Sequence, residues 1–193
     1  NEIDFRYSDA LTAADNAATF QTVVRTVARR NGLFADFSPK PLADRPGNGF
    51  HINLSVRPDD RRNFEAMIAG LLAHIGEMTL FLNPTPASYE RLGSHKAPGY
   101  ISWSRENRSQ LIRIPAAVGE YKRAELRSPD PSANPYLAFA LLIRAALDGV
   151  RRSLPLPAPV DENLYLAPKD VLDRLARLPR TLDADLMQRV LDG

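Results

Sequence analysis

The stretch RAELR places Arg123, Glu125 and Arg127 at alternate positions, so a β-strand would carry all three side chains on one face. The planar fork of arginine is suited to a bidentate grip on phosphate or carboxylate groups, and a carboxylate is a ligand that Mg²⁺ and Mn²⁺ prefer. The same pattern is also typical of the solvated face of an antiparallel sheet. The spacing therefore leaves two interpretations open, a site for phosphate and metal or an ordinary wet face.

Two further stretches alternate in the same way. In FHINLSV the apolar residues alternate with His51, Asn53 and Ser55, and in NEIDFRY the polar face carries Glu2. Two carboxylates and one imidazole are suitable ligands for Mg²⁺ or Mn²⁺. Together with the strand around Glu125, these faces favour a divalent metal site on one side of a sheet.

Arginine is dense in the same part of the sequence. The chain offers Arg91, Arg108 and Arg113 besides the pair that flanks Glu125, where a face that only served solubility would more often use lysine and glutamate. Enzymes that transfer phosphoryl groups typically combine a hard metal ion with several arginines. The sequence has no glycine-rich loop of the Walker type, so a bound nucleotide is expected on a sheet rather than at a helix N-terminus.

Composition bounds the class of protein. A length of 193 residues suits a single domain, and the absence of cysteine excludes disulfides and thiolate chemistry. The 25 basic and 23 acidic residues give a net charge of only +2, which indicates no nucleic-acid partner. No apolar run approaches the roughly 20 residues that cross a bilayer, so we expect no membrane partner and a soluble, cytoplasmic protein. The sequence opens without Met on a stretch that already alternates, and we expect a piece of a longer protein.

Hydrophobic periodicity predicts an α+β fold with a curved, mainly antiparallel sheet and helices packed on its outer face, because the later strands are joined by short connections. Strands are predicted over residues 1–7, 33–37, 50–56, 100–104, 109–115 and 120–127, and helices over residues 10–32, 63–83 and 136–150. The last helix is apolar nearly all round and is expected to be buried, and residues 83–99 are expected to form a loop. Short helices are expected after Pro168 and after Thr181, and His74 is expected to be a hydrogen-bonded histidine at the edge of the core.

An ordered series of blocks matches a known family: NEI followed by ADN, GNGFHINLS, NPTPASYERL, NRSQLIRIP, and AELRSPDPSANPYLAFALLIRAALDG. On these blocks, from Asn1 to about Leu166, the chain resembles the C-terminal portion of the catalytic domain of bacterial glutamine synthetases. The resemblance implies an enzyme that joins ammonia to glutamate with ATP, through a γ-glutamyl phosphate, and that uses Mg²⁺ or Mn²⁺. It also implies a homo-oligomeric ring, a dodecamer in the family. The family's N-terminal β-grasp domain and the first part of the catalytic domain would lie outside this chain, leaving the fragment inactive alone.

The resemblance also implies roles for individual residues. It assigns Glu2 to one metal ion and His51 with Glu125 to another. Arg91 matches the arginine that holds the carboxylate of substrate glutamate, and Gly47 matches a glycine whose backbone contacts that substrate.

The remaining matches lie on the phosphate and nucleotide side. Arg108 and Arg127 match arginines that act on the transferred phosphate. The arginine that Arg127 matches also holds the substrate. The nucleotide side is matched by Asn53, Ser55, Arg113 and Arg123.

Three residues depart from the family pattern. Lys96 stands in the flap where most members have the catalytic glutamate that helps to take a proton from ammonium, and Pro46 replaces a substrate-contacting asparagine. Asn53 stands where many members have a second histidine. These changes alter the amine side of the site, so a γ-glutamyl ligase for another amine, such as a polyamine, is an alternative. A non-catalytic member that acts as a binding or regulatory partner within a ring is a second alternative.

Tyr165 aligns with a tyrosine that some enterobacterial members of the family adenylylate. The same turn is equally suited to a tyrosine with a structural role. That regulation is therefore not transferred to this chain.

Overall fold

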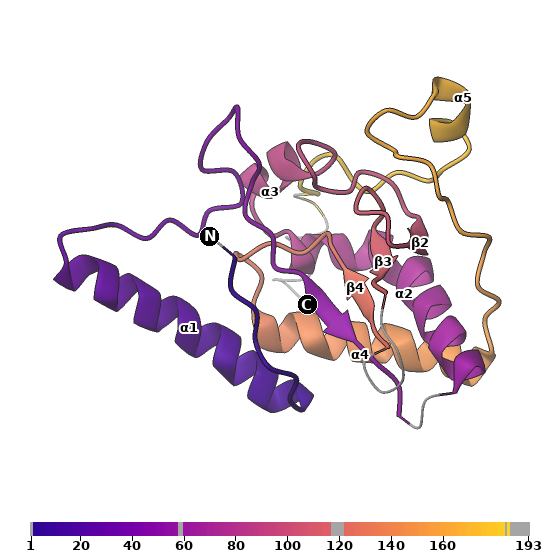
Figure 1. Ribbon diagram of the computed structural model, residues 1–193, viewed down its shortest axis with the longest axis horizontal. Coiled ribbons are helices and arrows are strands. Elements are labelled where there is room, and N and C mark those ends of the chain that lie inside the picture. Colours follow the sequence, from indigo (N-terminus) through magenta and orange to yellow (C-terminus); the bar gives the residue numbers. More distant parts are fainter. Residues whose placement is uncertain (1, 58–59, 117–121, 184, 186–193) are drawn as a thin grey trace.

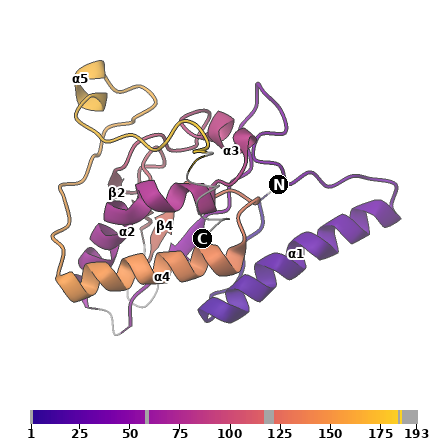
Figure 2. The same ribbon diagram turned by 180° about the vertical axis from the view of Figure 1, so that it is seen from behind.

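The computed structural model describes residues 2–57, 60–116, 122–183 and 185 (Figure 1). The described chain has three parts. In the body, within residues 50–153, two long helices pack on a small sheet; an arm of residues 2–49 extends to one side; and a C-terminal part follows residue 153. Figure 2 shows from behind that the helix of the arm stands apart from the sheet and approaches the body at one end.

The helix of the arm, α1 (Ala10–Arg30), confirms the sequence prediction. Its N-terminus is capped by Asp9, whose carboxylate accepts a hydrogen bond from the backbone N–H of Thr12 at 3.0 Å. The helix ends just before Gly32, which has a φ of 68° in the left-handed region that glycine tolerates.

The two long helices of the body, α2 (Arg61–Leu82) and α4 (Pro135–Arg152), cross at a pair of glycines. A Cβ added to Gly70 would lie 2.2 Å from the carbonyl oxygen of Ala145, and one added to Gly149 would lie 2.1 Å from that of Ala66. Gly70 therefore weakens the helix locally but permits the close approach of the two backbones.

His74 bridges the same two helices. Its Nε2 lies 2.9 Å from Oδ2 of Asp148 in α4. The prediction of a hydrogen-bonded histidine at the edge of the core is confirmed.

The sheet is mixed, with the strand order β1-β4-β3-β2. The strands are β1 (Ile52–Leu54), β2 (Trp103–Arg105), β3 (Ile112–Ile114) and β4 (Ala124–Leu126). β4 pairs antiparallel with both β1 and β3, whereas β2 and β3 are parallel.

The parallel pair corrects the prediction that the short connection joins antiparallel neighbours. Glu106 has a φ of 67°, and the side chain of Asn107 accepts a hydrogen bond from the backbone N–H of Ser109. These turns lead residues 106–111 back to the end of the sheet where β2 begins. β3 therefore runs parallel to β2.

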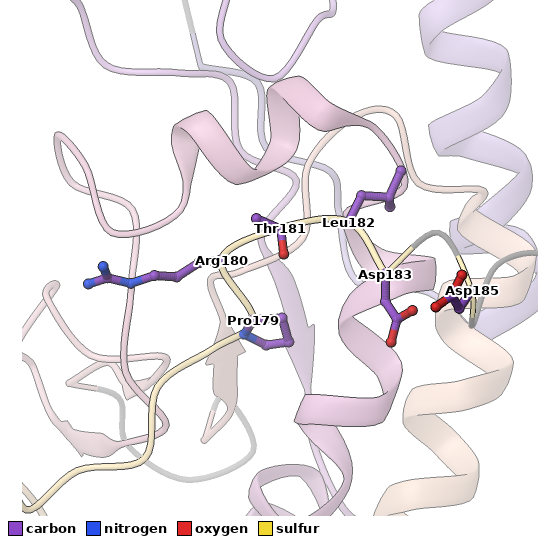
Figure 3. Close-up of a pocket in the computed structure, with 6 residues that line it drawn as sticks. All are labelled: Pro179, Arg180, Thr181, Leu182, Asp183 and Asp185. Atoms are coloured by element: carbon purple, nitrogen blue, oxygen red, sulfur yellow. The ribbon is translucent and has the colours of Figure 1, made fainter.

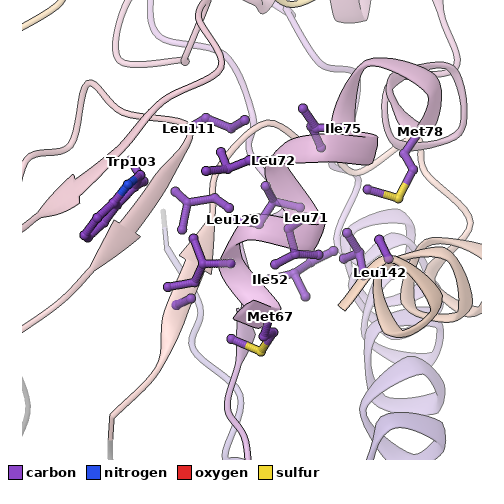
Figure 4. Close-up of a cluster of buried hydrophobic side chains, with 14 of the residues drawn as sticks. Ile52, Met67, Leu71, Leu72, Ile75, Met78, Trp103, Leu111, Leu126 and Leu142 are labelled. Carbon is purple, nitrogen blue, oxygen red and sulfur yellow. The ribbon is translucent and has the colours of Figure 1, made fainter. Parts of the chain in front are cut away.

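The core lies between the sheet and the two helices, as Figure 4 shows. One row of residues crosses all four strands and faces α2, and its members are Ile52, Leu126, Ile112 and Trp103. The alternation of the sequence thus separates a core face from a polar face, and the α+β class with helices on one side of the sheet is confirmed.

The edge strand β2 is covered by the proline-rich connection after α4. The indole Nε1 of Trp103 donates to the carbonyl of Pro157 at 2.8 Å, and the N–H of Val160 donates to the carbonyl of Trp103 at 2.9 Å. The cover protects the edge from pairing with another chain.

Two predicted strands are wrong, because residues 2–7 and 33–37 form no strand. Both stretches belong to the arm and expose apolar side chains, with 72% of Tyr7 and 82% of Phe34 accessible. A stretch becomes a strand only where a neighbouring strand pairs with it, and neither stretch is paired with any strand that the structure describes.

Two smaller corrections and one confirmation concern helices. The predicted loop at residues 83–99 contains α3 (Pro86–Arg91), which is started by a capping box of Thr85 and Ser88. Helix α4 is buried along one side only, since Tyr136, Leu137, Ile143 and Leu147 are 41–44% exposed. After Pro168 the predicted helix is found as α5 (Lys169–Leu172), whereas the one expected after Thr181 falls largely outside the described residues.

Helix α2 also corrects the statement that no apolar stretch reaches the length of a membrane span. By length and composition its 22 residues would suffice. However, 67% of the qualifying stretch is buried inside the protein, as in the core helix of a globular domain.

Candidate active site on the polar face of the sheet

Polar side chains form a row across the face of the sheet opposite the helices. Glu125 in the centre of β4 lies opposite Asn53 of β1 on one side and Arg113 of β3 on the other, and Ser104 of β2 continues the row. The row is the counterpart of the apolar row beneath it, so the register that builds the core also assembles the polar face.

Glu125 is the hub of this face and is only 8% exposed. Its Oε2 lies 2.7 Å from Nη1 of Arg113, and its Oε1 lies 3.1 Å from Nδ1 of His51 and 3.9 Å from Nε of Arg127. Burial alone would raise the pKa of Glu125, but the hydrogen bond from His51 and the charges of Arg127 and Arg113 outweigh it and lower that pKa below 4.5. The carboxylate is therefore ionised at neutral pH.

Arg127 is even more buried than Glu125, at 5% exposed. Its Nη1 donates to the carbonyl of Arg108 at 2.5 Å, which fixes the end of the guanidinium. The Nε of Arg127 and the Nε of Arg113 are buried, and within the described part of the chain neither has a hydrogen-bond partner. Two cationic donors without an acceptor are costly in a protein interior and suit an anionic ligand.

Arg91, at the end of α3, reaches the same region from another direction and is 3% exposed. Its Nη1 donates to the carbonyl of Ser128 at 2.7 Å, and its Nη2 donates to that of Arg127 at 3.2 Å. Burial lowers the pKa of Arg91 to about 10, so the group keeps its charge at neutral pH. The cation holds the backbone just after β4 in place.

The loop before β1 passes close to Arg91. A Cβ on Gly47 would lie 2.2 Å from the carbonyl oxygen of Pro39 and 3.0 Å from Cγ of Arg91. One on Gly49 would lie 2.8 Å from Nε2 of His51 and 2.9 Å from Nη2 of Arg91. The predictions did not include Gly49, although the repeated glycine in GNG is a visible sign of a close approach.

The sequence reasoning also missed a hydrogen-bonded clasp between residues 107–110 and 161–165. Asn107 and Gln110 donate from their side-chain amides to the carbonyl of Glu162, each at 2.9 Å. The hydroxyl of Ser109 accepts from the N–H of Leu164 at 2.9 Å. The clasp fixes the loop whose Arg108 carbonyl orients Arg127.

Tyr165 lies at the end of the clasp. Its hydroxyl is 3.4 Å from the carbonyl of Arg108, the same oxygen that accepts from Arg127. Burial raises the pKa of the Tyr165 phenol, although the charges of Arg127 and Arg91 act against it. The contact supports the structural role that the turn allows.

Arg123, Lys96, Ser55 and Glu2 are all less buried than Glu125. Arg123 donates from Nε to Oδ1 of Asn53 at 3.1 Å. Lys96 is exposed in the loop after α3 with a φ of 70°, and Ser55 follows β1 half-buried. Glu2 is exposed in the arm. Because residues 2–7 form no strand, Glu2 is not placed on the sheet.

A family model described as glutamine synthetase, catalytic domain, matches residues 1–189. The chain belongs to the glutamine synthetase family. This finding confirms the resemblance of the sequence blocks and covers almost the whole chain.

Curated glutamine synthetases support the same assignment. The chain is 46% identical to that of Clostridium saccharobutylicum over 86% of this chain and 40% of the relative. It is 45% identical to that of Methanosarcina mazei over 98% of this chain and 45% of the relative. The chain therefore spans less than half the length of these glutamine synthetases.

Two solved structures share the fold. A complex of GmaS with ADP superposes with a TM-score of 0.82 at 31% identity, covering 98% of this chain and 47% of the other. Apo GmaS gives a TM-score of 0.79 at 34% identity, covering 95% of this chain and 44% of the other.

The resemblance to glutamine synthetases implies divalent metal ions, and one pair of side chains in the structure is suited to bind such an ion. His51 Nδ1 and Glu125 Oε1 are 3.1 Å apart, close to the separation of about 3 Å expected for neighbouring ligands that are each about 2.1 Å from a Mg²⁺ ion. Among the residues that the structure describes, no three His, Cys, Asp or Glu side chains form a group that could hold a metal ion. The pair supplies part of a metal site.

The pocket in Figure 3 is a different region of the molecule. It is lined by a single stretch near the C-terminus, namely Pro179, Arg180, Thr181, Leu182, Asp183 and Asp185. None of these residues was predicted for the site, and the polar face contributes nothing to the pocket.

Proposed function

We propose that this chain belongs to an enzyme that joins ammonia to glutamate at the expense of ATP, through a γ-glutamyl phosphate. The observation that carries the proposal is the cluster on β3 and β4, where an ionised Glu125 lies between Arg113 and Arg127. The Nε donors of both arginines are buried and have no hydrogen-bond partner among the described residues. The activity is that of a protein of its relatives' length, since this chain spans 40–45% of them.

In this mechanism the arginines neutralise and position the transferred phosphoryl group. Arg127 and Arg108 act on the phosphate, and Arg113 and Arg123, with Asn53 and Ser55, lie on the nucleotide side. The ADP complex of GmaS, a structural relative, supports a nucleotide site in this fold.

The substrate side is formed by Arg91 and Gly47. The charged guanidinium of Arg91 is placed to attract the carboxylate of glutamate, and the backbone of Gly47 contacts the same substrate. His51 and Glu125 would hold one divalent ion, Mg²⁺ or Mn²⁺, and Glu2 would bind another. When bound, such an ion supplies charge neutralisation at the phosphate oxygens.

The test is an assay of the full-length protein with ATP, Mg²⁺, glutamate and ammonium. We expect phosphate release that depends on glutamate, and Glu125→Gln should lower it by roughly 100-fold, the upper range for weakening a metal site. The matched control is Glu65→Gln, which removes a charge from the exposed pair with Arg61 on α2 and should leave the rate unchanged. Absence of phosphate release in the wild type would refute the proposal.

A second candidate is a γ-glutamyl ligase for another amine. Lys96 and Pro46 favour it, because a cation in the flap repels ammonium and the proline removes a polar side chain near the substrate. Replacing ammonium by alkylamines and polyamines in the same assay separates the candidates, and a higher kcat/KM with ammonium would eliminate the second. No turnover with any amine would favour a non-catalytic partner.

We also propose a cytoplasmic, homo-oligomeric ring for the full-length protein. Exposed apolar residues of the arm and of α4, such as Phe34 and Leu147, are suited to burial against other protein surface. Sedimentation of the purified full-length protein tests the assembly, and a monomer at micromolar concentration would contradict it.

A further inference from the structure

Gly49 is the point where the two halves of the candidate site meet. The position that a Cβ would occupy lies 2.8 Å from Nε2 of His51 and 2.9 Å from Nη2 of Arg91. Because real Cβ atoms do not approach other heavy atoms so closely, any side chain at this position would displace the imidazole, the guanidinium, or both.

The backbone around Gly49 has little room to yield. On one side, the N–H of Asn48 donates to the carbonyl of Pro39 at 2.9 Å, and its side-chain amide donates to the carbonyl of Ser38 at 2.7 Å. On the other side, the N–H of Phe50 donates to the carbonyl of Pro129 at 2.8 Å. An added methyl group would therefore be accommodated by the side chains rather than by the loop.

The conformation of Gly49 itself does not require glycine. The only described glycines with a positive φ are Gly32 and Gly93, so an alanine could adopt the backbone angles of Gly49. The need for glycine at this position comes from the two functional side chains.

Gly47, two residues earlier, is a contrasting case. A Cβ there would lie 2.2 Å from a backbone carbonyl oxygen, that of Pro39, so a substitution would distort the loop. The two glycines of this loop thus have different roles. Gly47 avoids a clash with the backbone, whereas Gly49 avoids a clash with two side chains of the site.

We propose that Gly49 is a positioning residue that keeps the imidazole of His51 and the guanidinium of Arg91 adjacent, and so couples the metal side of the site to the carboxylate side. The inference rests on the proposed function and on the pair of His51 and Glu125 as donors to a divalent ion. It predicts that Gly49→Ala leaves the fold intact and impairs both sides of the site together.

The experiment uses the full-length protein with three measurements, namely thermal unfolding, Mn²⁺ binding by calorimetry, and KM for glutamate. For Gly49→Ala we expect the unfolding temperature of the wild type and roughly tenfold losses in Mn²⁺ affinity and in apparent glutamate affinity. The matched control is Gly76→Ala on the exposed side of α2, where a Cβ meets nothing within 4 Å and neither affinity should change. Wild-type affinities in Gly49→Ala would overturn the inference.

A double substitution tests the path of the effect. In a His51→Ala background the imidazole is absent, so adding Gly49→Ala should cause no further loss of Mn²⁺ affinity. An additive loss would overturn the inference. If Gly49→Ala alone fails to fold, recovery of folding in the His51→Ala double variant supports the contact, and failure of both shows that Gly49 serves the backbone instead.

Mn²⁺ binding does not require turnover. If the wild type binds Mn²⁺ but releases no phosphate, the proposed function fails while the positioning role of Gly49 is still measured. If the wild type is active and Gly49→Ala matches it, only the positioning role fails.

Discussion

Most of the buried apolar side chains belong to the body, whereas many apolar side chains of the arm face outward. Ile68, Leu71 and Ile75 of α2 are fully buried, while Phe34 and Leu33 of the arm are 82% and 67% exposed. The core cluster consists of body residues together with Leu178 from the C-terminal part, and none of its members comes from the arm. The difference teaches that the phosphate side of the site, on β3 and β4, rests on the stable part of the chain, whereas Glu2 and Gly47 depend on the part with less support.

The largest effect is expected at the helix crossing that holds the body together. Gly149→Ala would place a Cβ 2.1 Å from the carbonyl oxygen of Ala66 and 2.7 Å from Cα of Gly70, so the two helices must separate. We expect urea denaturation of the chain to show a loss of about 3 kcal/mol in the free energy of unfolding. A helical glycine with open space around it, Gly76, provides the control, because Gly76→Ala should be neutral or stabilising. A Gly149→Ala protein as stable as the wild type would mean that the crossing does not support the body.

The next effect concerns the buried charge at the centre of the polar face. Glu125→Gln leaves Arg113 and Arg127 without their anion and should cost about 2 kcal/mol at neutral pH, measured by the same denaturation. The exposed variant Glu65→Gln should cost far less. Equal stability of the two variants would contradict the role of Glu125 as a hub.

The same residue predicts a pH dependence. Because the pKa of Glu125 is lower in the folded chain than its ordinary value of 4.5, its ionisation stabilises the fold above that pH, and the contribution is lost as the pH falls through the folded pKa. The wild type should therefore lose more stability than Glu125→Gln when the pH is lowered from about 6 to about 3. Parallel pH profiles for the two proteins would contradict the prediction.

A smaller effect is expected in the clasp. Ser109→Ala removes the hydroxyl that accepts from the N–H of Leu164 and leaves that buried donor unpaired, at a cost of about 1 kcal/mol. Ser109→Thr keeps a hydroxyl and serves as the conservative comparison. If alanine and threonine behave alike, the hydrogen bond does not hold residues 161–165.

The smallest effect is expected in the arm. Phe34→Ser changes a side chain that is 82% exposed, so the free energy of unfolding should shift by less than about 0.5 kcal/mol. Light scattering should show less self-association, because the apolar surface is reduced. A loss of stability as large as that of Gly149→Ala would remove the distinction between arm and body.

Where both partners of a contact lie on regular alternating strands, the sequence was a good guide. The alternation placed His51, Asn53 and Glu125 on polar faces, and the strand register puts Asn53 opposite Glu125. His51, just before β1, reaches the same carboxylate. Arg113, which the sequence offered only through the density of arginine, lies opposite Glu125 on β3. Family blocks also identified the glutamine synthetase fold. These inferences needed only the period of a strand and the order of the motifs.

The remaining errors come from information that the alternation does not contain. Residues 2–7 alternate as well as β1 does, yet a strand also requires a neighbour. The parallel pairing of β2 and β3 depends on the positive φ of Glu106, for which a non-glycine residue gives no sign. The role of Gly49 depends on Arg91, which approaches from a helix more than forty positions away in the sequence.

The cover over the edge strand β2 gives the chain an optical reporter. Trp103 is the single tryptophan of the sequence, is 7% exposed, and donates through its indole to Pro157. Its fluorescence therefore follows the docking of the connection that leads to Tyr165 and the clasp. A red shift of the emission would signal release of that connection without any label being introduced.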